Sequence, residues 1–142
     1  MSDLNELSHI DPATKAKVLL EALPYVQKFR DSLFVVKYGG SFLDENNLEM
    51  QRRVAMDIVF LSSVGIRVAL VHGGGKAITR ALSQSGIETR FVNGLRYTDE
   101  ATIKVVEQTL NGEVNEQICK TIKDAGGIPA PTHGQRVFAC EK

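Results

Sequence analysis

The sequence has 142 residues, of which 43% are hydrophobic and 24% are charged, values typical of one soluble globular domain with a single core. Its 17 basic and 17 acidic residues cancel, so no basic field favours nucleic acid or an anionic membrane surface. The longest apolar runs, such as 68–71, fall far short of the roughly 20 residues of a membrane-spanning helix, and no export signal precedes them. We predict a cytoplasmic protein with a small-molecule partner.

The first predicted element is a helix over 12–30. Asp11 and Pro12 are typical of an N-cap followed by proline in the first helical turn. Apolar residues then recur at helical spacing and form a broad stripe: Val18, Leu19, Ala22, Leu23, Tyr25, Val26 and Phe29. The stripe predicts a packing partner, which is either the same domain or another protein chain.

Two strands and two helices are predicted next, in alternation. The apolar run 33–37 leads into Gly39 and Gly40, and a helical pattern over 46–64 follows it. A second apolar run over 67–71 leads into three glycines and then a helix that stops near Gly86. Strands that alternate with helices predict an α/β fold with a parallel sheet.

The rest of the chain predicts a hairpin and a long helical region. Residues 90–98 alternate around Asn93-Gly94, a pair typical of hairpin turns. A helix is expected from Asp99 to the glycines at 126–127, with an interruption near Asn111-Gly112. Two short strands are then predicted, over 128–130 and 137–140. No helix follows the second of these strands to cover it, so we expect the chain to be truncated.

Lys37, Gly39 and Gly40 form the first candidate site. They stand at the carboxyl end of the first predicted strand, where open α/β sheets bind ligands. Glycines let the backbone approach an oxyanion, and a lysine neutralises transferring phosphoryl oxygens. Alone, this pattern fits an ordinary strand-to-loop turn equally well.

The second candidate site is the run of glycines at 73–75, which follows His72 and precedes a helix. A helix N-terminus that is preceded by bare backbone favours a carboxylate or a phosphate. The run matches neither the dinucleotide fingerprint nor the phosphate loop of nucleotide hydrolases. His72 is interpreted as an orienting or structural residue, because no serine or cysteine nucleophile pattern accompanies it.

Arg96, at the end of the hairpin, is the third candidate. Its guanidinium could form a bidentate pair with a substrate carboxylate, although a single arginine is more often a surface residue. Cys119 and Cys140 lack metal-ligand spacing, so we predict two buried thiols and no metal site.

Taken together, the motifs resemble the amino-acid kinase family, in particular its members that phosphorylate N-acetyl-L-glutamate. The segments that carry the resemblance are VVKYGGS at 35–41, VHGGGKAI at 71–78, RFVNGLRYTDE at 90–100 and VNEQI at 114–118. The resemblance implies a three-layer αβα sandwich with a mainly parallel sheet, a carbamate kinase-like fold that is truncated here. It further implies an N-terminal extension over 1–31 and an acceptor-substrate lobe over 32–142.

By this resemblance, the chain would serve ATP-dependent phosphorylation of the γ-carboxylate of N-acetyl-L-glutamate, a step of arginine biosynthesis. Lys37 would stabilise the transition state. Gly74, Gly75 and Arg96 would bind the substrate, and Gly39, Gly40 and Gly73 would line the phosphate path. ATP and Mg²⁺ would be held largely by a nucleotide-binding half without counterpart here, so the fragment is expected to be inactive alone.

The resemblance also implies a homo-oligomer, a dimer or a hexamer interlaced through the 12–30 helix, and feedback inhibition by arginine. Alternatives stay open from the sequence. One is the kinase-like domain of an N-acetylglutamate synthase, and another is a sister kinase acting on aspartate, glutamate or a nucleotide. A third is a non-catalytic regulatory or assembly module of the same fold.

Overall fold

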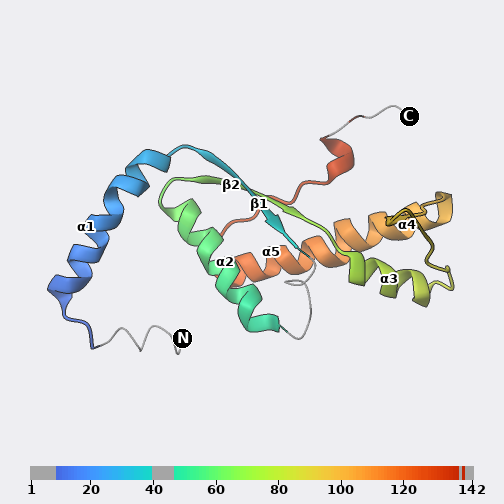
Figure 1. The fold of residues 1–142 in the computed structure, drawn as a ribbon, viewed down its shortest axis with the longest axis horizontal. Coiled ribbons are helices and arrows are strands. Elements are labelled where there is room, and N and C mark those ends of the chain that lie inside the picture. The colour runs from blue at the N-terminus through green and yellow to red at the C-terminus, as the bar shows by residue number, and fades with distance from the viewer. Residues whose placement is uncertain (1–8, 40–46, 138, 140–142) are drawn as a thin grey trace.

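The computed structural model of the chain describes residues 9–39, 47–137 and 139. Two parallel strands lie at its centre, β1 over Leu33–Tyr38 and β2 over Arg67–His72, as Figure 1 shows. The register runs from Leu33 opposite Arg67 to Tyr38 opposite His72. Both strands therefore end at the same edge of the sheet, which confirms the predicted parallel pairing.

Helices cover one face of this strand pair. Side chains on β1 alternate in burial, and Phe34, Val36 and Tyr38 are the less exposed set. The helices α2 (Leu48–Ser63) and α5 (Asn115–Asp124) lie on one side of the strand pair in Figure 1. The core forms there around Tyr38, Val114 and Ile118, with Leu70 of β2 packed against it. On the other face Val35 is 67% exposed. The described residues thus form a sheet layer and a helix layer of an α/β fold.

The predicted N-terminal helix is present as α1, over Pro12–Phe29. The Asp11 carboxylate accepts a hydrogen bond from the Thr14 backbone N–H at 3.0 Å, which confirms the predicted N-cap. Figure 1 shows α1 extending away from the other helices, and none of its residues is buried. An edge-on contact between the rings of Phe29 and Phe34, at 5.5 Å, ties the end of α1 to β1. The described residues therefore leave the apolar stripe of α1 uncovered.

The third helix, α3 over Gly75–Gln84, leads to the predicted hairpin, whose strands are β3 (Phe91–Val92) and β4 (Leu95–Arg96). Asn93 and Gly94 have φ angles of 51° and 79°. These left-handed values at both turn positions are what a tight two-residue hairpin requires, and Asn-Gly supplies them with little strain.

The predicted interruption of the long helical region is a widened turn rather than a break. α4 (Glu100–Gln108) passes into the π-helical segment η2 (Thr109–Val114), and η2 passes into α5. The Asp99 side chain caps α4 by accepting from the Thr102 N–H at 2.8 Å. Single π-helical turns inside longer helices are frequent at functional sites, and this one lies against the second glycine turn.

The predicted strand over 128–130 is wrong. These residues lack strand pairing, and Ile128 is 99% exposed. Pro129 and Pro131 have no backbone N–H to give to a strand ladder, which accounts for the irregular path. The segment ends in a short 3-10 helix, η3 over Gly134–Arg136.

Of the second predicted strand, over 137–140, Val137 and Ala139 are not in a strand, while positions 138 and 140 lie outside the described residues. The predicted thiol of Cys140 therefore lies there too, and Cys119 is half-buried. Among the described residues, no helix combines the length and the hydrophobicity needed to cross a lipid bilayer.

Candidate acceptor-substrate site

The carboxyl edge of the strand pair brings the first two predicted motifs side by side. Lys37 of β1 lies opposite Val71 of β2, and Tyr38 lies opposite His72. Lys37 is exposed on the face that the helices leave free, and Gly39 is half-buried just beyond it. The predicted role of Gly40 falls outside the described residues. The strand pairing thus places Lys37 one strand away from the start of the 73–75 turn.

The turn after β2 leads directly into α3. The Gly74 carbonyl accepts the first helical hydrogen bond, from the Ile78 N–H at 2.8 Å, and α3 begins at Gly75. The first N–H groups of a helix have no partner within it and carry partial positive charge, so this end is suited to an anion. The His72 ring Nδ1 lies 3.3 Å from the Gly73 carbonyl oxygen, which fits the interpretation of His72 as an orienting residue.

Packing gives Gly74 a structural reason to be glycine. A Cβ atom at this buried position would lie 2.7 Å from Leu110 Cδ2 and 3.2 Å from Val114 Cγ2, both on the π-helical segment η2. A Cβ at Gly73 or Gly75 would meet nothing within 4 Å. The turn therefore rests on η2 through Gly74, and its other two glycines face open space.

Arg96 lies at the N-terminal end of α3, because the hairpin folds back toward it. One guanidinium nitrogen, Nη2, donates to the Thr79 hydroxyl at 2.9 Å and to the Gly75 carbonyl at 3.4 Å. The other, Nη1, donates to the Thr89 hydroxyl at 3.2 Å, and the guanidinium carbon lies 4.9 Å from the centre of the Phe91 ring. Arg96 is half-buried, so it is held in place rather than free at the surface.

The structure thus unites two of the three predicted motifs by direct contact, Arg96 with Gly75. Lys37 is brought to the same edge by strand pairing. No hydrogen bond joins it to Arg96 within the described part of the chain. Lys37 lies one residue before the end of β1 at Tyr38, and Arg96 lies against the first turn of α3. A guanidinium beside the N-terminal end of a helix is suited to an anionic group.

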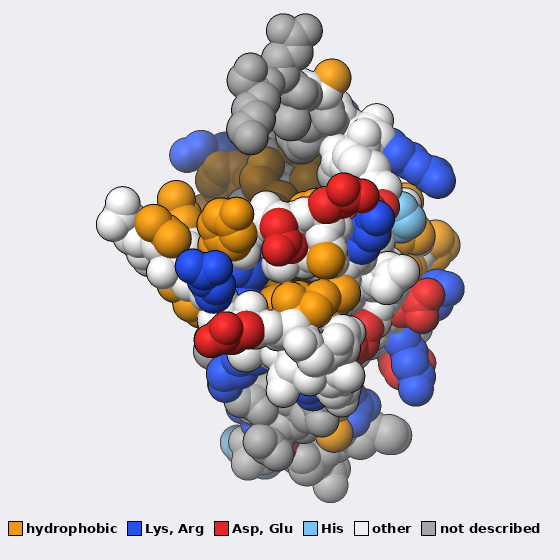
Figure 2. Space-filling model, turned by 90° about the vertical axis from the view of Figure 1, so that its right-hand side faces the viewer, with side chains coloured by type: hydrophobic (Ala, Val, Ile, Leu, Met, Phe, Trp, Pro, Cys, Tyr) orange, Lys and Arg blue, Asp and Glu red, His pale blue; other side chains and the backbone are white. Residues whose placement is uncertain are grey.

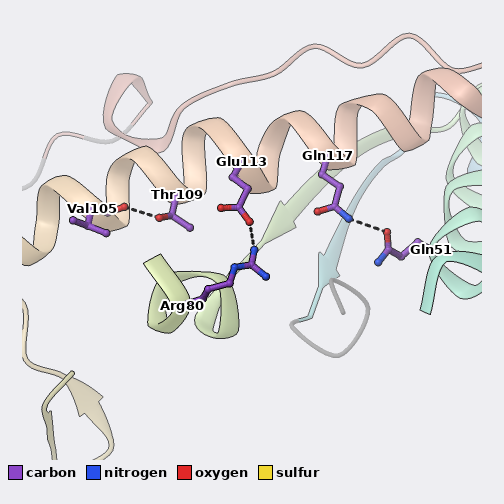
Figure 3. Close-up of polar contacts among 6 residues, drawn as sticks. All are labelled: Gln51, Arg80, Val105, Thr109, Glu113 and Gln117. Atoms are coloured by element: carbon purple, nitrogen blue, oxygen red, sulfur yellow. Dashed lines mark hydrogen bonds and ion pairs between the residues drawn. The ribbon is translucent and has the colours of Figure 1, made fainter. Parts of the chain in front are cut away.

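Several polar residues that support this site were not predicted from the sequence. Figure 3 shows Arg80 of α3 reaching Glu113 of η2, with which it forms an ion pair, and Gln117 of α5 donating to Gln51 of α2 at 3.3 Å. The partner of Arg80 lies 33 residues away, so no local spacing could have signalled the pair.

Thr79 was missed as well, although a local signal existed. It stands four residues after Gly75, one helical turn, and its hydroxyl donates to the Gly75 carbonyl at 2.9 Å. Residues three and four apart face each other on a helix, so any side chain at 79 can influence the first turn of α3.

The surface at this end of the molecule mixes polar and apolar side chains. Figure 2 looks onto the end that carries α3, α4 and the hairpin, and hydrophobic side chains there are interspersed with charges of both signs. Phe91, Val92, Leu95 and Tyr97 of the hairpin are all exposed, and the Arg90 guanidinium carbon lies 5.5 Å from the Tyr97 ring centre.

The described residues do not form a carboxylate cluster that could hold magnesium on its own. Within 9–39, 47–137 and 139, His, Cys, Asp and Glu do not gather into a group of three or more that could hold a metal ion, whereas Mg²⁺ is bound through carboxylates together with substrate phosphates. The described residues therefore hold no preformed cluster for a metal ion.

Comparison with known proteins defines the class. Residues 32–141 match the family model described as the amino acid kinase family. The match spans most of the chain, and its strand ends carry the glycine turns described above. The chain belongs to the amino acid kinase family, whose chemistry depends on ATP.

Within that class, the similar curated proteins are acetylglutamate kinases. The chain is 46% identical over 134 residues to the acetylglutamate kinase of Thermoanaerobacter sp., covering 93% of this chain and 44% of the relative. It is 49% identical over 127 residues to that of Trichormus variabilis, covering 88% and 42%. The chain therefore spans less than half the length of the curated relatives that it matches.

Among solved structures, the chain is similar to N-acetylglutamate synthase from Neisseria gonorrhoeae complexed with coenzyme A and N-acetyl-glutamate. That likeness has a TM-score of 0.60 and 29% identity, and covers 75% of this chain and 24% of the other. The same synthase with coenzyme A and L-arginine has a TM-score of 0.54 at 26% identity, over 79% and 25%.

Proposed function

We propose that this chain forms the acceptor-substrate site of an enzyme that phosphorylates the γ-carboxylate of N-acetyl-L-glutamate with ATP, a step of arginine biosynthesis in the cytoplasm. The observation that carries the proposal is the contact of Arg96 with Gly75 at the N-terminal end of α3. The identity of 41–49% to proteins named acetylglutamate kinase supports this substrate.

Binding rests on the complementary charge of the substrate. N-acetyl-L-glutamate carries two carboxylates. The guanidinium of Arg96 and the backbone N–H groups at Gly74 and Gly75 would hold the one that does not react, through charge-assisted hydrogen bonds. Because Arg96 is already fixed by three hydrogen bonds, little side-chain freedom is lost when the substrate binds.

Phosphoryl transfer needs no protein nucleophile. An oxygen of the γ-carboxylate attacks the γ-phosphorus of ATP, the bond from that phosphorus to the bridging oxygen breaks, and ADP leaves with the electron pair. The attacking carboxylate is already ionised, so no proton has to be removed. Lys37 would neutralise the charge that develops on the transferred phosphoryl oxygens, and Gly39, Gly40 and Gly73 would let these oxygens approach the backbone.

ATP itself would bring Mg²⁺ bound to its phosphates. No group of three or more His, Cys, Asp or Glu gathers among the described residues, so the ion would be held by the nucleotide phosphates and largely by the nucleotide-binding half. The exposed face of β1 and the carboxyl edge of the sheet are the places from which a nucleotide-binding half, as predicted from the sequence, would reach Lys37.

A second candidate is the kinase-like domain of an N-acetylglutamate synthase. The structural likeness to the gonococcal synthase favours it. The kinase proposal has better support, because identity to the curated kinases is 46–49% in the examples above and identity to the synthase is 29%. A non-catalytic module has the weakest support, since such a module has no physical need to combine Lys37 with Arg96 and the glycine turns.

We also propose that the enzyme is a homo-oligomer, a dimer or a hexamer, that uses the uncovered apolar stripe of α1 and is inhibited by arginine. Leu19 is 72% exposed, which supports α1 as a contact surface. Analytical ultracentrifugation of the chain and of a Leu19→Glu, Leu23→Glu variant tests this. A single monomeric species for both proteins, even at high protein concentration, would contradict it.

The function is tested with a chimera. This chain replaces the matched residues of the Thermoanaerobacter acetylglutamate kinase, and ADP formation is followed with N-acetyl-L-glutamate, aspartate and glutamate as acceptors. We expect phosphorylation of N-acetyl-L-glutamate alone. Activity with aspartate or glutamate instead, or a folded chimera that binds ATP but phosphorylates no acceptor, would contradict the proposal. Acetyl transfer from acetyl-coenzyme A to glutamate, measured for the protein encoded by the complete gene, would favour the synthase.

A further inference from the structure

We infer that Thr79 is a positioning residue for Arg96, which fixes the substrate-binding guanidinium over the first turn of α3. The inference rests on the proposed function, because the position of Arg96 affects substrate binding only if Arg96 holds a substrate carboxylate. Thr79 itself is not assigned to any contact with substrate. It acts through the arginine.

The donor and acceptor capacity of the Thr79 hydroxyl sets the direction of each of its hydrogen bonds. A hydroxyl has one proton to give and two lone pairs to receive. The Gly75 carbonyl can only accept, so the Thr79 hydroxyl donates its proton to that oxygen, at 2.9 Å. A guanidinium can only donate, so the Thr79 oxygen accepts from Arg96 Nη2, at 2.9 Å. One hydroxyl therefore connects the helix backbone to the arginine, with both of its roles defined.

The Arg96 contacts leave part of its donor set for a ligand. A guanidinium has five N–H groups. The Nη2 atom donates to Thr79 and Gly75, and Nη1 donates once, to Thr89. Among the described residues this leaves the Nε–H and one Nη1–H for a substrate. These two N–H groups lie on different edges of the planar guanidinium, so each would donate to a separate ligand oxygen. Thr79 and Thr89 thus hold the guanidinium through both of its Nη atoms while these two donors stay available.

A purely structural role for Thr79, in which its hydroxyl only bonds to the carbonyl one turn earlier, can be separated from the positioning of Arg96, because the chain has a matched threonine. Thr121 of α5 also donates its hydroxyl proton to the carbonyl one turn earlier, that of Gln117, at 2.9 Å. Its oxygen accepts from no arginine among the described residues. Thr121→Val therefore measures the effect of losing only the hydrogen bond from the hydroxyl to the helix carbonyl. Any additional effect in Thr79→Val comes from losing the contact with Arg96.

The experiment is calorimetric titration of N-acetyl-L-glutamate into the 142-residue chain and its variants. Thr79→Val keeps the shape and removes the hydroxyl, so we expect binding about fivefold weaker than wild type, the effect of losing one hydrogen bond. Thr79→Ser restores the hydroxyl and should bind within about twofold of wild type, which assigns the loss in Thr79→Val to the hydroxyl rather than to the methyl group. Thr121→Val should bind like wild type. Equal binding by Thr79→Val and wild type, or equal weakening in Thr79→Ser, would overturn the inference.

A second readout needs no ligand. The Arg96 side-chain Nη–H signals in an ¹H–¹⁵N NMR spectrum recorded near 0 °C, assigned by their loss in Arg96→Lys, should exchange slowly with water in wild type and Thr79→Ser, because Thr79 accepts from Nη2. In Thr79→Val they should exchange faster. Unchanged Nη–H signals in Thr79→Val would overturn the inference. If wild type fails to bind N-acetyl-L-glutamate, the proposed function is contradicted, and the NMR comparison still decides the role of Thr79.

Discussion

The Nη2 atom of Arg96 lies 3.4 Å from the carbonyl oxygen of Gly75, although 21 residues of sequence separate the two. This contact joins the hairpin to the first turn of α3. It makes one site out of two motifs that, taken singly, fit ordinary turns and surface arginines.

Replacement of Arg96 by alanine should weaken binding of N-acetyl-L-glutamate by about 1.5–3 kcal/mol, the usual value for hydrogen bonds to a charged group. Arg96→Lys should recover only part of this loss, because an ammonium cannot form the planar fork. Calorimetry on the chain measures both. Arg90→Ala is the matched control, since Arg90 contacts the Tyr97 ring outside the site and should bind normally. Equal losses in the Arg90 and Arg96 variants would contradict the assignment.

Lys37 should affect turnover more than binding. In the active chimera, Lys37→Ala should lower kcat with little change in KM for N-acetyl-L-glutamate, because the lysine acts on charge that develops in the transition state. Arg96→Ala in the same chimera should mainly raise KM. Steady-state kinetics on the two variants measure the difference, and identical effects on both parameters would contradict the separate roles.

Gly74→Ala should destabilise the fold by about 1–3 kcal/mol, as expected when a well-packed site is overfilled. The added Cβ would press on Leu110 and on Val114, and Val114 is stiff and buried. Gly73→Ala provides the control, because its Cβ would enter open space. Urea unfolding followed by circular dichroism compares the two variants. An equal cost at both positions would show that the contact with η2 does not restrict residue 74.

The capping carboxylate of Asp99 should make α4 sensitive to acid. Hydrogen bonds from Thr102 hold the pKa of Asp99 below its ordinary value of 3.8. A lowered pKa in the folded state means that the stabilisation is complete above about pH 3.8 and is lost as the pH falls through the lowered pKa. In Asp99→Asn, the side-chain oxygen still caps and does not titrate, so helix loss on acidification should be smaller than in wild type. A circular dichroism titration from pH 5 to 2 measures this, and parallel curves would contradict it.

Tyr38 should titrate later than the other tyrosines. Burial raises the pKa of its phenol above 10.0, whereas Tyr25 and Tyr97 are exposed. Because the folded pKa is raised, the contribution of Tyr38 to stability is complete below about pH 10 and is lost as the pH rises through the raised value. Ultraviolet titration at 295 nm should show a late step from one of the three tyrosines, and Tyr38→Phe should remove it. Three indistinguishable tyrosines in the folded chain would contradict this.

Local patterns predicted most of the regular structure. Asp11 with Pro12 marked the start of α1, and Asn93 with Gly94 marked the hairpin turn, because these residue pairs meet strict local requirements on backbone geometry. The strand predicted at 128–130 failed for a related reason: its apolar residues were given more weight than its prolines, which cannot donate to a ladder. Local periodicity also indicated an interruption at Asn111 but not its form, a widened turn that stays helical.

The site could be predicted only in part. Lys37, the glycine turns and Arg96 could be named as candidates because strand ends and charge carry a signal in the sequence, and their roles stay predictions. The contacts that hold Arg96 join residues 7, 17 and 21 positions apart, and the reason that residue 74 is glycine depends on Leu110 and Val114. The Arg80–Glu113 ion pair, 33 residues apart, left no local pattern. Thr79 carried a local signal through its spacing from Gly75, but its contact with Arg96 became visible only in the folded chain.

The central claim is that N-acetyl-L-glutamate binds where Arg96 meets the first turn of α3. The most direct measurement is an NMR titration of the ¹⁵N-labelled chain with this ligand. We predict saturable shifts of the Gly73 to Gly75 amides and of the Arg96 side-chain N–H, all of which disappear in Arg96→Ala. Saturable shifts confined to other residues, shifts that persist unchanged in Arg96→Ala, or no saturable shift at all would contradict the account.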